Sequence, residues 1–334
     1  MASGLTEPAN TRARTGEMAT SEVIGVFGAN GFIGRHLVRR LIKEGRPAIA
    51  FGREFPADFF EVVGGEIQTR RIDINDELET HASLQGISQV VQLINTSNPA
   101  MGNKKLIPDV RLNVESQVTF IESCIMTRVK NFVFISSGGT VYGLPEQSPI
   151  SETHPTRPLN SYGLCKLMVE HYLRMLTRGT DLGYTILRVS NPFGPGQMSA
   201  KGQGLVPAVL HRLAAGAPIT ILGDGTSERD YIYIEDVIDA IISCLDRVPI
   251  RDVVNIGSGR GRTVLEVLEA IEKVLGRTTD RIYTEARATD TPSNVLDISK
   301  AEELLGWRPT TDFDDAMKLT IDAYQLDAVH QQIA

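Results

Sequence analysis

Apolar, β-prone runs alternate with amphipathic segments of helix length between residues 22 and 189. The expected strands lie at residues 22–27, 47–51, 67–72, 90–94, 131–135 and 184–189. The expected helices between them include residues 35–44, 110–126 and 162–176. Parallel strands need crossover helices, and these cover both faces of the sheet. The alternation therefore predicts an α/β fold built on a Rossmann-type, doubly wound parallel sheet.

The pattern changes after Asn191, where prolines and glycines interrupt the chain and shorter elements follow. This change predicts a smaller, interleaved C-terminal α/β substrate lobe. We expect a disordered tail over residues 1–21 and a dinucleotide-binding domain over 22–190, with returning segments near 230–258. The substrate lobe is expected mainly over 191–330. The expected elements of this second part are helices at 205–214, 237–245, 264–275 and 301–305 and strands at 219–222 and 253–256.

Bulk properties narrow the class of protein. The 334 residues carry a net charge of −7 and no long basic run, which gives no reason to expect nucleic acid as a partner. No apolar stretch is long enough to span a membrane. The only cysteines are Cys124, Cys165 and Cys244, an odd set without a CxxC pair. We therefore expect reduced thiols, no zinc or other metal site, and a cytoplasmic protein.

The stretch 24-IGVFGANGFIGRHL-37 places three glycines between the first strand and the first helix. Glycine permits the tight turn, the close approach of a pyrophosphate to the backbone, and the packing of the helix on the strand. The helix N-terminus then stabilises the bound anion. The alternative is a plain strand–helix turn, but the context favours a dinucleotide site. Its predicted contacts are Gly28, Asn30, Gly31, Phe32, Ile33 and Gly34.

The segment 161-SYGLCK-166 places Tyr162 and Lys166 four residues apart, so on a helix they share one face. A cationic Lys166 would lower the pKa of Tyr162, which could then accept or donate a proton near neutral pH. A YxxxK pair alone is common on solvated helix faces. Its position after the fifth strand favours the catalytic interpretation, with both side chains also facing the cofactor.

The glycine spacing, the Tyr–Lys pair and 136-SSGGTVYG-143 together resemble the extended short-chain dehydrogenase/reductase superfamily. In that family the third position of the last motif is commonly Ser or Thr, which hydrogen-bonds the reacting sugar oxygen. Gly138 stands there in this chain. The resemblance implies that Ser137 or Thr140 replaces the missing hydroxyl. We favour Thr140, although it could instead cap the strand end.

Further landmarks extend the resemblance from about residue 22 to 307 and identify the NAD-dependent epimerase/dehydratase family. They are 187-LRVSNPFGPGQ-197, 229-RDYIYIEDV-237, 254-VNIGSG-259 and 295-VLDISKAEELLGW-307. The similarity is greatest to nucleotide-sugar epimerases of the UDP-glucose type. Relatives commonly form homodimers through a four-helix bundle, which here would use residues 110–126 and 162–176.

The motif 136-SSGGTVYG-143 also distinguishes between the activities found in this family. Its sugar dehydratases carry an Asp–Glu pair where this chain has Gly139 and Thr140, and its decarboxylases tend to carry Glu at the latter position. Elimination and decarboxylation are therefore disfavoured. The resemblance implies a UDP- or dTDP-hexose 4-epimerase that passes a hydride to a bound nicotinamide and back. The alternatives are an NADP-dependent nucleotide-4-ketosugar reductase and a non-enzymatic dinucleotide-binding scaffold.

The end of the second strand leaves the cofactor open between NAD and NADP. Gly52 stands where the family often has an acidic residue, and Arg53 follows. Arg53 could bind a 2′-phosphate, or it could stack beside adenine or face solvent. The resemblance also implies contacts to the cofactor from the ends of strands and from one helix. These residues are Asp73, Ile74, Leu93, Ile94, Asn95, Asn113 and Ser136.

The substrate side is implied by the resemblance alone. Asn191 matches a residue that contacts the phosphate or the sugar, and Leu205 and Val206 match residues whose backbone meets the base. Arg229 and Arg287 match two arginines that bind the diphosphate, a task that suits the planar guanidinium fork. Asp290 matches an acid at the ribose. For either arginine the alternative is a surface ion pair.

Overall fold

A computed structural model describes residues 22–97, 106–197, 204–286 and 291–331, with side chains as far as Tyr324. The tail over residues 1–21, for which the sequence predicts disorder, lies outside the described residues. Within the described chain, no helix is both long enough and apolar enough to cross a membrane. Cys124, Cys165 and Cys244 are buried and free.

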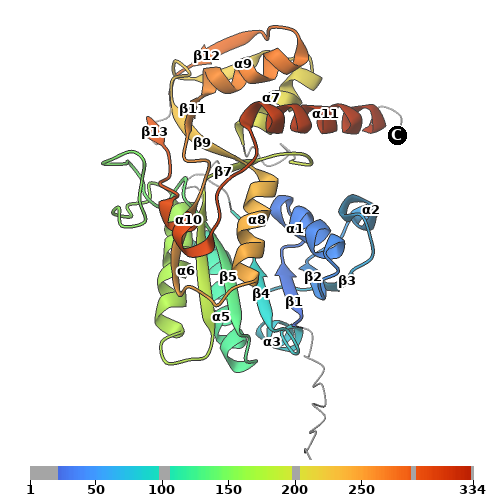
Figure 1. The fold of residues 1–334 in the computed structure, drawn as a ribbon, viewed down its shortest axis with the longest axis vertical. Helices are drawn as coiled ribbons and strands as arrows, with labels where there is room; N and C mark the ends of the chain where they lie inside the picture. The colour runs from blue at the N-terminus through green and yellow to red at the C-terminus, as the bar shows by residue number, and fades with distance from the viewer. Residues whose placement is uncertain (1–21, 98–105, 198–203, 287–290, 332–334) are drawn as a thin grey trace, which may run out of the picture.

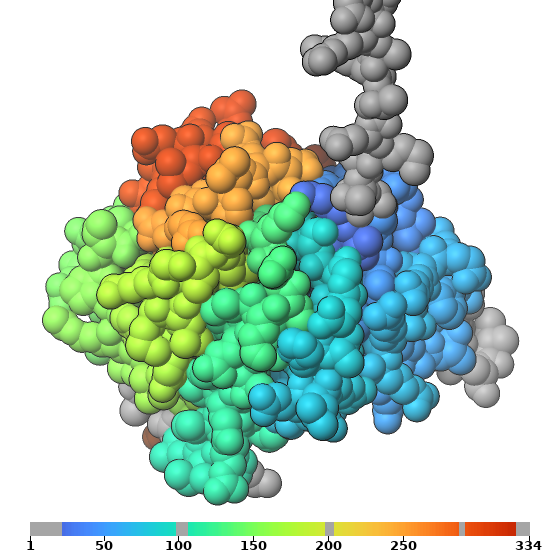
Figure 2. Space-filling model, turned by 90° about the horizontal axis from the view of Figure 1, so that it is seen from below, coloured from blue at the N-terminus to red at the C-terminus, as the bar shows by residue number. Residues whose placement is uncertain are grey.

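A seven-stranded parallel sheet forms the lower part of the molecule, with strand order β10-β6-β5-β4-β1-β2-β3 (Figure 1). Seen from below, the colours run from orange through yellow-green and green to cyan and blue, which follows this order (Figure 2). The strands are β1 (Ile24–Phe27), β2 (Ala48–Gly52), β3 (Gln68–Arg71), β4 (Gln89–Gln92), β5 (Asn131–Ser137), β6 (Gly183–Val189) and β10 (Asp252–Ile256). The predicted Rossmann-type sheet is confirmed. Its order reverses between β1 and β4, the position at which open α/β sheets bind ligands.

Helices cover both faces of this sheet because successive side chains of a strand point to opposite sides. On β5, Val133 and Ile135 pack in one core, and Phe132 and Phe134 pack in the other. The first core includes α1 (Phe32–Lys43), α2 (Phe59–Val63), α8 (Ile234–Leu245) and α10 (Ser299–Leu305). The second includes α5 (Ser116–Met126) and α6 (Ser161–Leu176), and α3 (Glu77–Ser83) lies against α5.

A smaller lobe lies above the sheet in Figure 1 and has a core of its own. Its four-stranded sheet contains β7 (Asn191–Phe193), β9 (Glu228–Tyr233), β11 (Gly261–Thr263) and β13 (Ser293–Asn294). A separate parallel pair is formed by β8 (Ile219–Leu222) and β12 (Arg281–Thr284). The helices are α7 (Leu205–Ala214), α9 (Val264–Leu275) and α11 (Phe313–Gln331). Because β9 continues directly into α8, the chain passes from this lobe back to the large sheet.

The helix predicted over residues 110–126 differs from the observed one. The chain forms α4 (Leu106–Val110), a π-helical turn η2 (Arg111–Glu115) and then α5. A π-helical turn widens the helix locally and is frequent at functional sites. Here it accompanies the burial of the polar residue Asn113, which is followed by the buried polar residues Ser116 and Gln117.

Candidate active site

The glycine turn brings α1 close to β1 and β4. Gly28 has a φ of 92°, a region that favours glycine, and a Cβ there would lie 3.1 Å from the Ile94 nitrogen. A Cβ on Gly34 would lie 2.3 Å from the Gly28 carbonyl oxygen, so only glycine allows this helix–strand contact. Gly31 is the N-cap of α1 and offers no side-chain cap. The first turn of α1 therefore presents backbone N–H groups of the kind that bind a phosphate.

The turn residues Asn30, Phe32 and Ile33 differ in their surroundings. The Asn30 amide donates to the Glu54 carbonyl and so holds the end of β2 against the turn. Phe32 and Ile33 are partly buried at the start of α1 and pack on the first core. These contacts hold the turn in place. Because Gly28, Gly31 and Gly34 have no side chains, its backbone stays accessible to a ligand.

The end of β2 presents Arg53 to solvent. Its guanidinium makes no hydrogen bond or ion pair within the described ranges. The neighbouring Gly52 is buried, and a Cβ on it would lie 3.3 Å from Asn30 Oδ1. After the adjacent strand β3, Ile74 is buried, whereas Asp73 is exposed and accepts hydrogen bonds from the Asn75 backbone and amide.

The end of β4 is held by Asn113 from η2. Its Oδ1 accepts from the Thr96 backbone N–H at 2.8 Å and from the Thr96 hydroxyl at 3.0 Å. Its Nδ2 donates to Asp109 Oδ1 at 2.6 Å. Asn113 is thus engaged in positioning the loop after Ile94, and the Asn95 amide donates within that loop to the Ser97 carbonyl. Leu93 and Ile94 lie where a Cβ on Gly28 would reach.

Tyr162 and Lys166 lie on α6, which starts beside the end of β5. Burial raises the pKa of Tyr162 to about 12, and a hydrogen bond with the Ser137 side chain opposes that rise. Burial also lowers the pKa of Lys166 to about 8. The Lys166 ammonium donates to the Ile135 carbonyl at 2.9 Å and lies 5.9 Å from the centre of the Tyr162 ring. The expected lowering of the Tyr162 pKa by Lys166 is not seen: burial raises this pKa, and the group that opposes the rise is Ser137, not Lys166.

The turn after β5 brings Ser137, not Thr140, to Tyr162. The Thr140 hydroxyl oxygen is buried and has no hydrogen-bond partner in the described part of the chain. The neighbouring Ser136 directs its hydroxyl to Glu170, deeper in the molecule. The geometry therefore favours Ser137 over Thr140 as the hydroxyl that would meet a substrate oxygen.

Leu296 fills the space beside Gly138. A Cβ at position 138 would lie 2.5 Å from Leu296 Cδ1 and 3.0 Å from the Arg188 carbonyl oxygen. Leu296 is fully buried, and Asn294 on β13 donates to the Gly138 carbonyl at 3.2 Å. The absence of a hydroxyl at position 138 is thus matched by an apolar side chain from the C-terminal part of the chain.

The structure describes some of the residues predicted to bind the substrate. The Asn191 amide donates to the Asp230 carbonyl at 3.0 Å, and its Oδ1 points towards Gly139. Arg229 donates to the carbonyls of Glu228 and Thr291. Leu205 and Val206 begin α7, and Val206 is buried. Arg287 and Asp290 lie outside the described residues.

Sequence reasoning did not select several residues that support these groups. Asp109 binds both Asn113 and the Ser161 hydroxyl, which precedes Tyr162. Gly163 lets α6 approach the Thr140 carbonyl, which a Cβ would meet at 2.8 Å. Glu170 and Asp230 are buried carboxylates. The sequence offered only their positions as signals of a role in the site. Glu170 follows Lys166 by one helical turn, and Asp230 follows Arg229.

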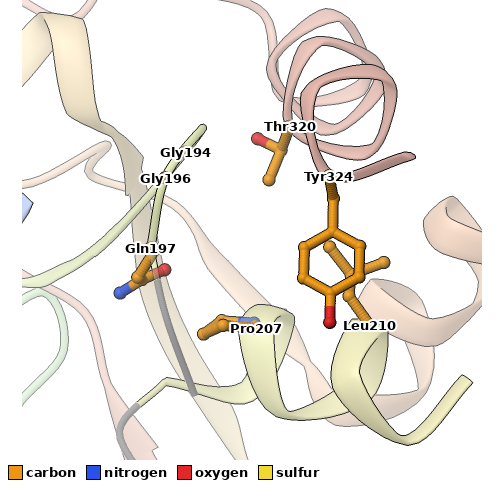
Figure 3. A pocket seen from close by; sticks show the side chains of 7 residues that line it. All are labelled: Gly194, Gly196, Gln197, Pro207, Leu210, Thr320 and Tyr324. Carbon is orange, nitrogen blue, oxygen red and sulfur yellow. The ribbon is translucent and has the colours of Figure 1, made fainter. Parts of the chain in front are cut away.

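A small cavity lies away from this constellation, between the loop after β7, α7 and α11 (Figure 3). Gln197, Thr320 and Tyr324 are among the side chains that line it. Its volume is about that of one water molecule, and neither Tyr162 nor Lys166 reaches it. No ligand is assigned to it.

Comparison with known proteins agrees with this arrangement. The chain is 32% identical over 298 residues to dTDP-4-dehydro-6-deoxyglucose reductase from Escherichia coli, covering 87% of this chain and 94% of the relative. It is 32% identical over 302 residues to UDP-glucose 4-epimerase from Lactobacillus helveticus, covering 85% and 91%. The structure of UDP-glucose 4-epimerase with UDP-glucose from Thermotoga maritima matches with a TM-score of 0.85 and 30% identity, covering 91% and 99%.

The model of the NAD dependent epimerase/dehydratase family matches residues 24–257. This range includes the glycine turn, the Ser137–Tyr162 contact, Lys166 and the strand β10 that completes the sheet. The sequence motifs, the fold and the relatives thus agree, and the chain belongs to the NAD-dependent epimerase/dehydratase family.

Proposed function

We propose that this protein is a nucleotide-sugar 4-epimerase that acts on a UDP- or dTDP-hexose through a 4-keto intermediate. The observation that carries the proposal is the position of the Ser137 side chain beside the Tyr162 hydroxyl at the carboxyl end of β5, where it opposes the rise of the Tyr162 pKa, with Lys166 buried one turn along α6. This contact sets a proton acceptor beside a hydroxyl donor. Gly139 and Thr140 supply no carboxylate for an elimination.

The residues of the glycine turn fit a nicotinamide dinucleotide, since Gly28, Gly31 and Gly34 leave the backbone uncovered at the start of α1. When bound, this cofactor reversibly accepts a hydride. Tyr162 takes the proton of the sugar 4-hydroxyl, and Ser137 donates a hydrogen bond to the same oxygen. Lys166, whose ammonium lies 5.9 Å from the centre of the Tyr162 ring, is proposed to stabilise the negative charge that develops on Tyr162 during proton transfer.

The upper lobe is proposed to hold the nucleotide. Arg229 at the start of β9, together with Arg287 and Asp290, would bind the diphosphate and ribose, and the first turn of α7 at Leu205 and Val206 would meet the base. Asn191 lies between the two parts of the site, because its side chain bonds to β9 and points towards Gly139. The solved Thermotoga maritima relative was obtained with UDP-glucose, which is the substrate class proposed here.

The test has two readouts. The protein is denatured and the released nicotinamide is identified by mass spectrometry, and separately UDP- and dTDP-hexoses are followed by NMR. Near-stoichiometric NAD together with conversion of one hexose into its 4-epimer supports the proposal. If every sugar remains unchanged with cofactor present, the epimerase assignment is wrong.

A second candidate is an NADP-dependent nucleotide-4-ketosugar reductase. It is favoured by the exposed, unpaired Arg53 beside Gly52 within the described chain, and by the reductase from Escherichia coli among the relatives. Arg53→Ala should then weaken NADPH binding about tenfold or more while leaving NADH binding nearly unchanged. Arg277→Ala, on the far lobe, is the matched control. Equal losses for both cofactors would remove Arg53 as a 2′-phosphate ligand.

We also propose a homodimer formed by α5 and α6. Met126 on α5 and Leu164 and Met175 on α6 are exposed apolar side chains on these helices. Multi-angle light scattering should give twice the chain mass of 36.6 kDa, and Leu164→Glu should shift the protein towards the monomer. A monomeric mass for the unmodified protein at micromolar concentration would contradict the proposal.

A further inference from the structure

The ammonium group of Lys166 is buried, and few neighbouring groups offset the cost of burying its charge. Its side chain is 5% exposed, and its one hydrogen bond within the described chain goes to the Ile135 carbonyl. The Phe134 ring centre lies 4.9 Å from its nitrogen. No carboxylate of the described residues comes within ion-pair distance. Burial disfavours a charged amine, so another group must keep this lysine protonated.

Glu170 lies one turn further along the same helix and is 1% exposed. Arg188 on β6 holds it with two bonds, from Nε to Oε1 at 3.1 Å and from Nη2 to Oε2 at 2.6 Å. The Ser136 hydroxyl donates to Oε1 as well. These bonds fix the carboxylate in place, and they also hold it away from direct contact with Lys166.

The other charged and titratable groups around Lys166 do not take this role. On α6 they are Tyr162 and Cys165, both of which burial keeps neutral by raising their pKa values. From α4, Asp109 faces the start of α6, where it binds Ser161. From β6, Arg188 is cationic and is stacked at 4.8 Å over the Tyr142 ring. The acidic side chain that favours the Lys166 ammonium most is therefore Glu170.

We propose that Glu170, fixed by Arg188 and Ser136, is a positioning residue that keeps Lys166 charged while leaving its ammonium hydrogens free for the site. A direct Lys–Glu ion pair would hold Lys166 away from Tyr162, whereas a carboxylate one turn away acts through space. The pKa of Lys166 agrees: burial lowers it to about 8, and the charge of Glu170 opposes the fall. The inference rests on the proposed role of Lys166 beside Tyr162.

The test measures the lysine directly and needs no turnover. Protein labelled with ¹³C at lysine Cε is titrated by NMR, and the Lys166 signal is assigned by its loss in Lys166→Met. Glu170→Gln should lower the titration midpoint of Lys166 by about one pH unit. Glu272→Gln, which breaks the distant Glu272–Arg281 pair, should leave the midpoint unchanged.

Glu170→Gln leaves Arg188 buried without its partner and could prevent folding. The double variant Glu170→Gln/Arg188→Met removes the pair as a unit and keeps the packing. Its Lys166 midpoint should fall by less than in Glu170→Gln, because the loss of the positive charge of Arg188 partly offsets the loss of the negative charge of Glu170. Ser136→Ala keeps both charges and should shift the midpoint little.

Two results would overturn the inference. One is an unchanged Lys166 midpoint in a folded variant without Glu170, and the other is an equal shift in Glu272→Gln. Because the readout does not use a sugar substrate, it decides the inference even if the protein epimerises none. Where activity is found, its alkaline limb should move to lower pH in Glu170→Gln by the same amount.

Discussion

Ser137→Ala is expected to lower kcat by about 10²-fold, since it removes one donor aimed at the developing charge on the sugar oxygen. The Ser137 side chain lies beside the Tyr162 hydroxyl and opposes the rise of its pKa, so it stands where a 4-hydroxyl would transfer its proton. Thr140→Val should change kcat by less than about threefold. Its hydroxyl is buried and has no partner in the described part of the chain, and valine has nearly the same shape. Steady-state rates on the sugar identified by NMR give both values.

Thermal unfolding separates catalysis from folding in this pair of variants. Thr140→Val removes an unsatisfied buried hydroxyl and should leave Tm equal or higher. Tyr162→Phe serves as the reference for loss of the proton acceptor. If Thr140→Val lost more activity than Ser137→Ala at equal Tm, Thr140 would be the hydroxyl that polarises the substrate, as the sequence alone favours.

Asp230→Asn should destabilise the protein by about 3 kcal/mol or more. The carboxylate is fully buried and accepts hydrogen bonds only. Oδ1 accepts from Ser190, from the Ser258 hydroxyl and, at 2.6 Å, from the Ser258 backbone N–H. Oδ2 accepts from the N–H groups of Gly259 and Leu296, both at 3.2 Å. An amide can replace one oxygen but would turn its own hydrogens towards buried donors.

Denaturant unfolding monitored by circular dichroism measures this effect. Asp224→Asn is the control, because Asp224 is exposed on the same lobe and, among the described residues, its side chain bonds to Thr226 alone. We expect the control to unfold at nearly the unmodified denaturant concentration. A midpoint for Asp230→Asn equal to that of the control would show that the five acceptor contacts contribute little to folding.

Much of the frame could be predicted from the sequence because it depends on local patterns. The period of apolar residues located α7, β8 and α9 with their observed bounds, and the glycine spacing located the turn before α1. Short elements such as α2 and β12, with 5 and 4 residues, were missed because they are too brief to set a period of apolar residues. The break in helix 110–126 was missed too. It depends on Asn113 bonding to Thr96, a contact between segments that no local pattern encodes.

In the candidate site, too, residues marked by a local pattern could be predicted, and residues defined by tertiary contacts could not. Tyr162 and Lys166 were found because their spacing on one helix is itself the signal. The choice between Ser137 and Thr140 depends on how a turn is folded, and residue types alone do not settle it. Glu170 and Asp230 were missed because their partners, Arg188 and Ser258, are distant in sequence or adjacent only through the fold.

The contact between Gly138 and Leu296 links two positions that lie far apart in the chain, and it constrains how this lineage can change. A hydroxyl-bearing side chain at 138 cannot be accommodated while Leu296 occupies the space. Shrinking Leu296 first would leave a cavity in a packed core, which is itself destabilising. Either single step is costly, whereas the two together restore close packing. A serine or threonine at position 138 is therefore expected to require a smaller side chain at position 296, so the two positions should change as a matched pair.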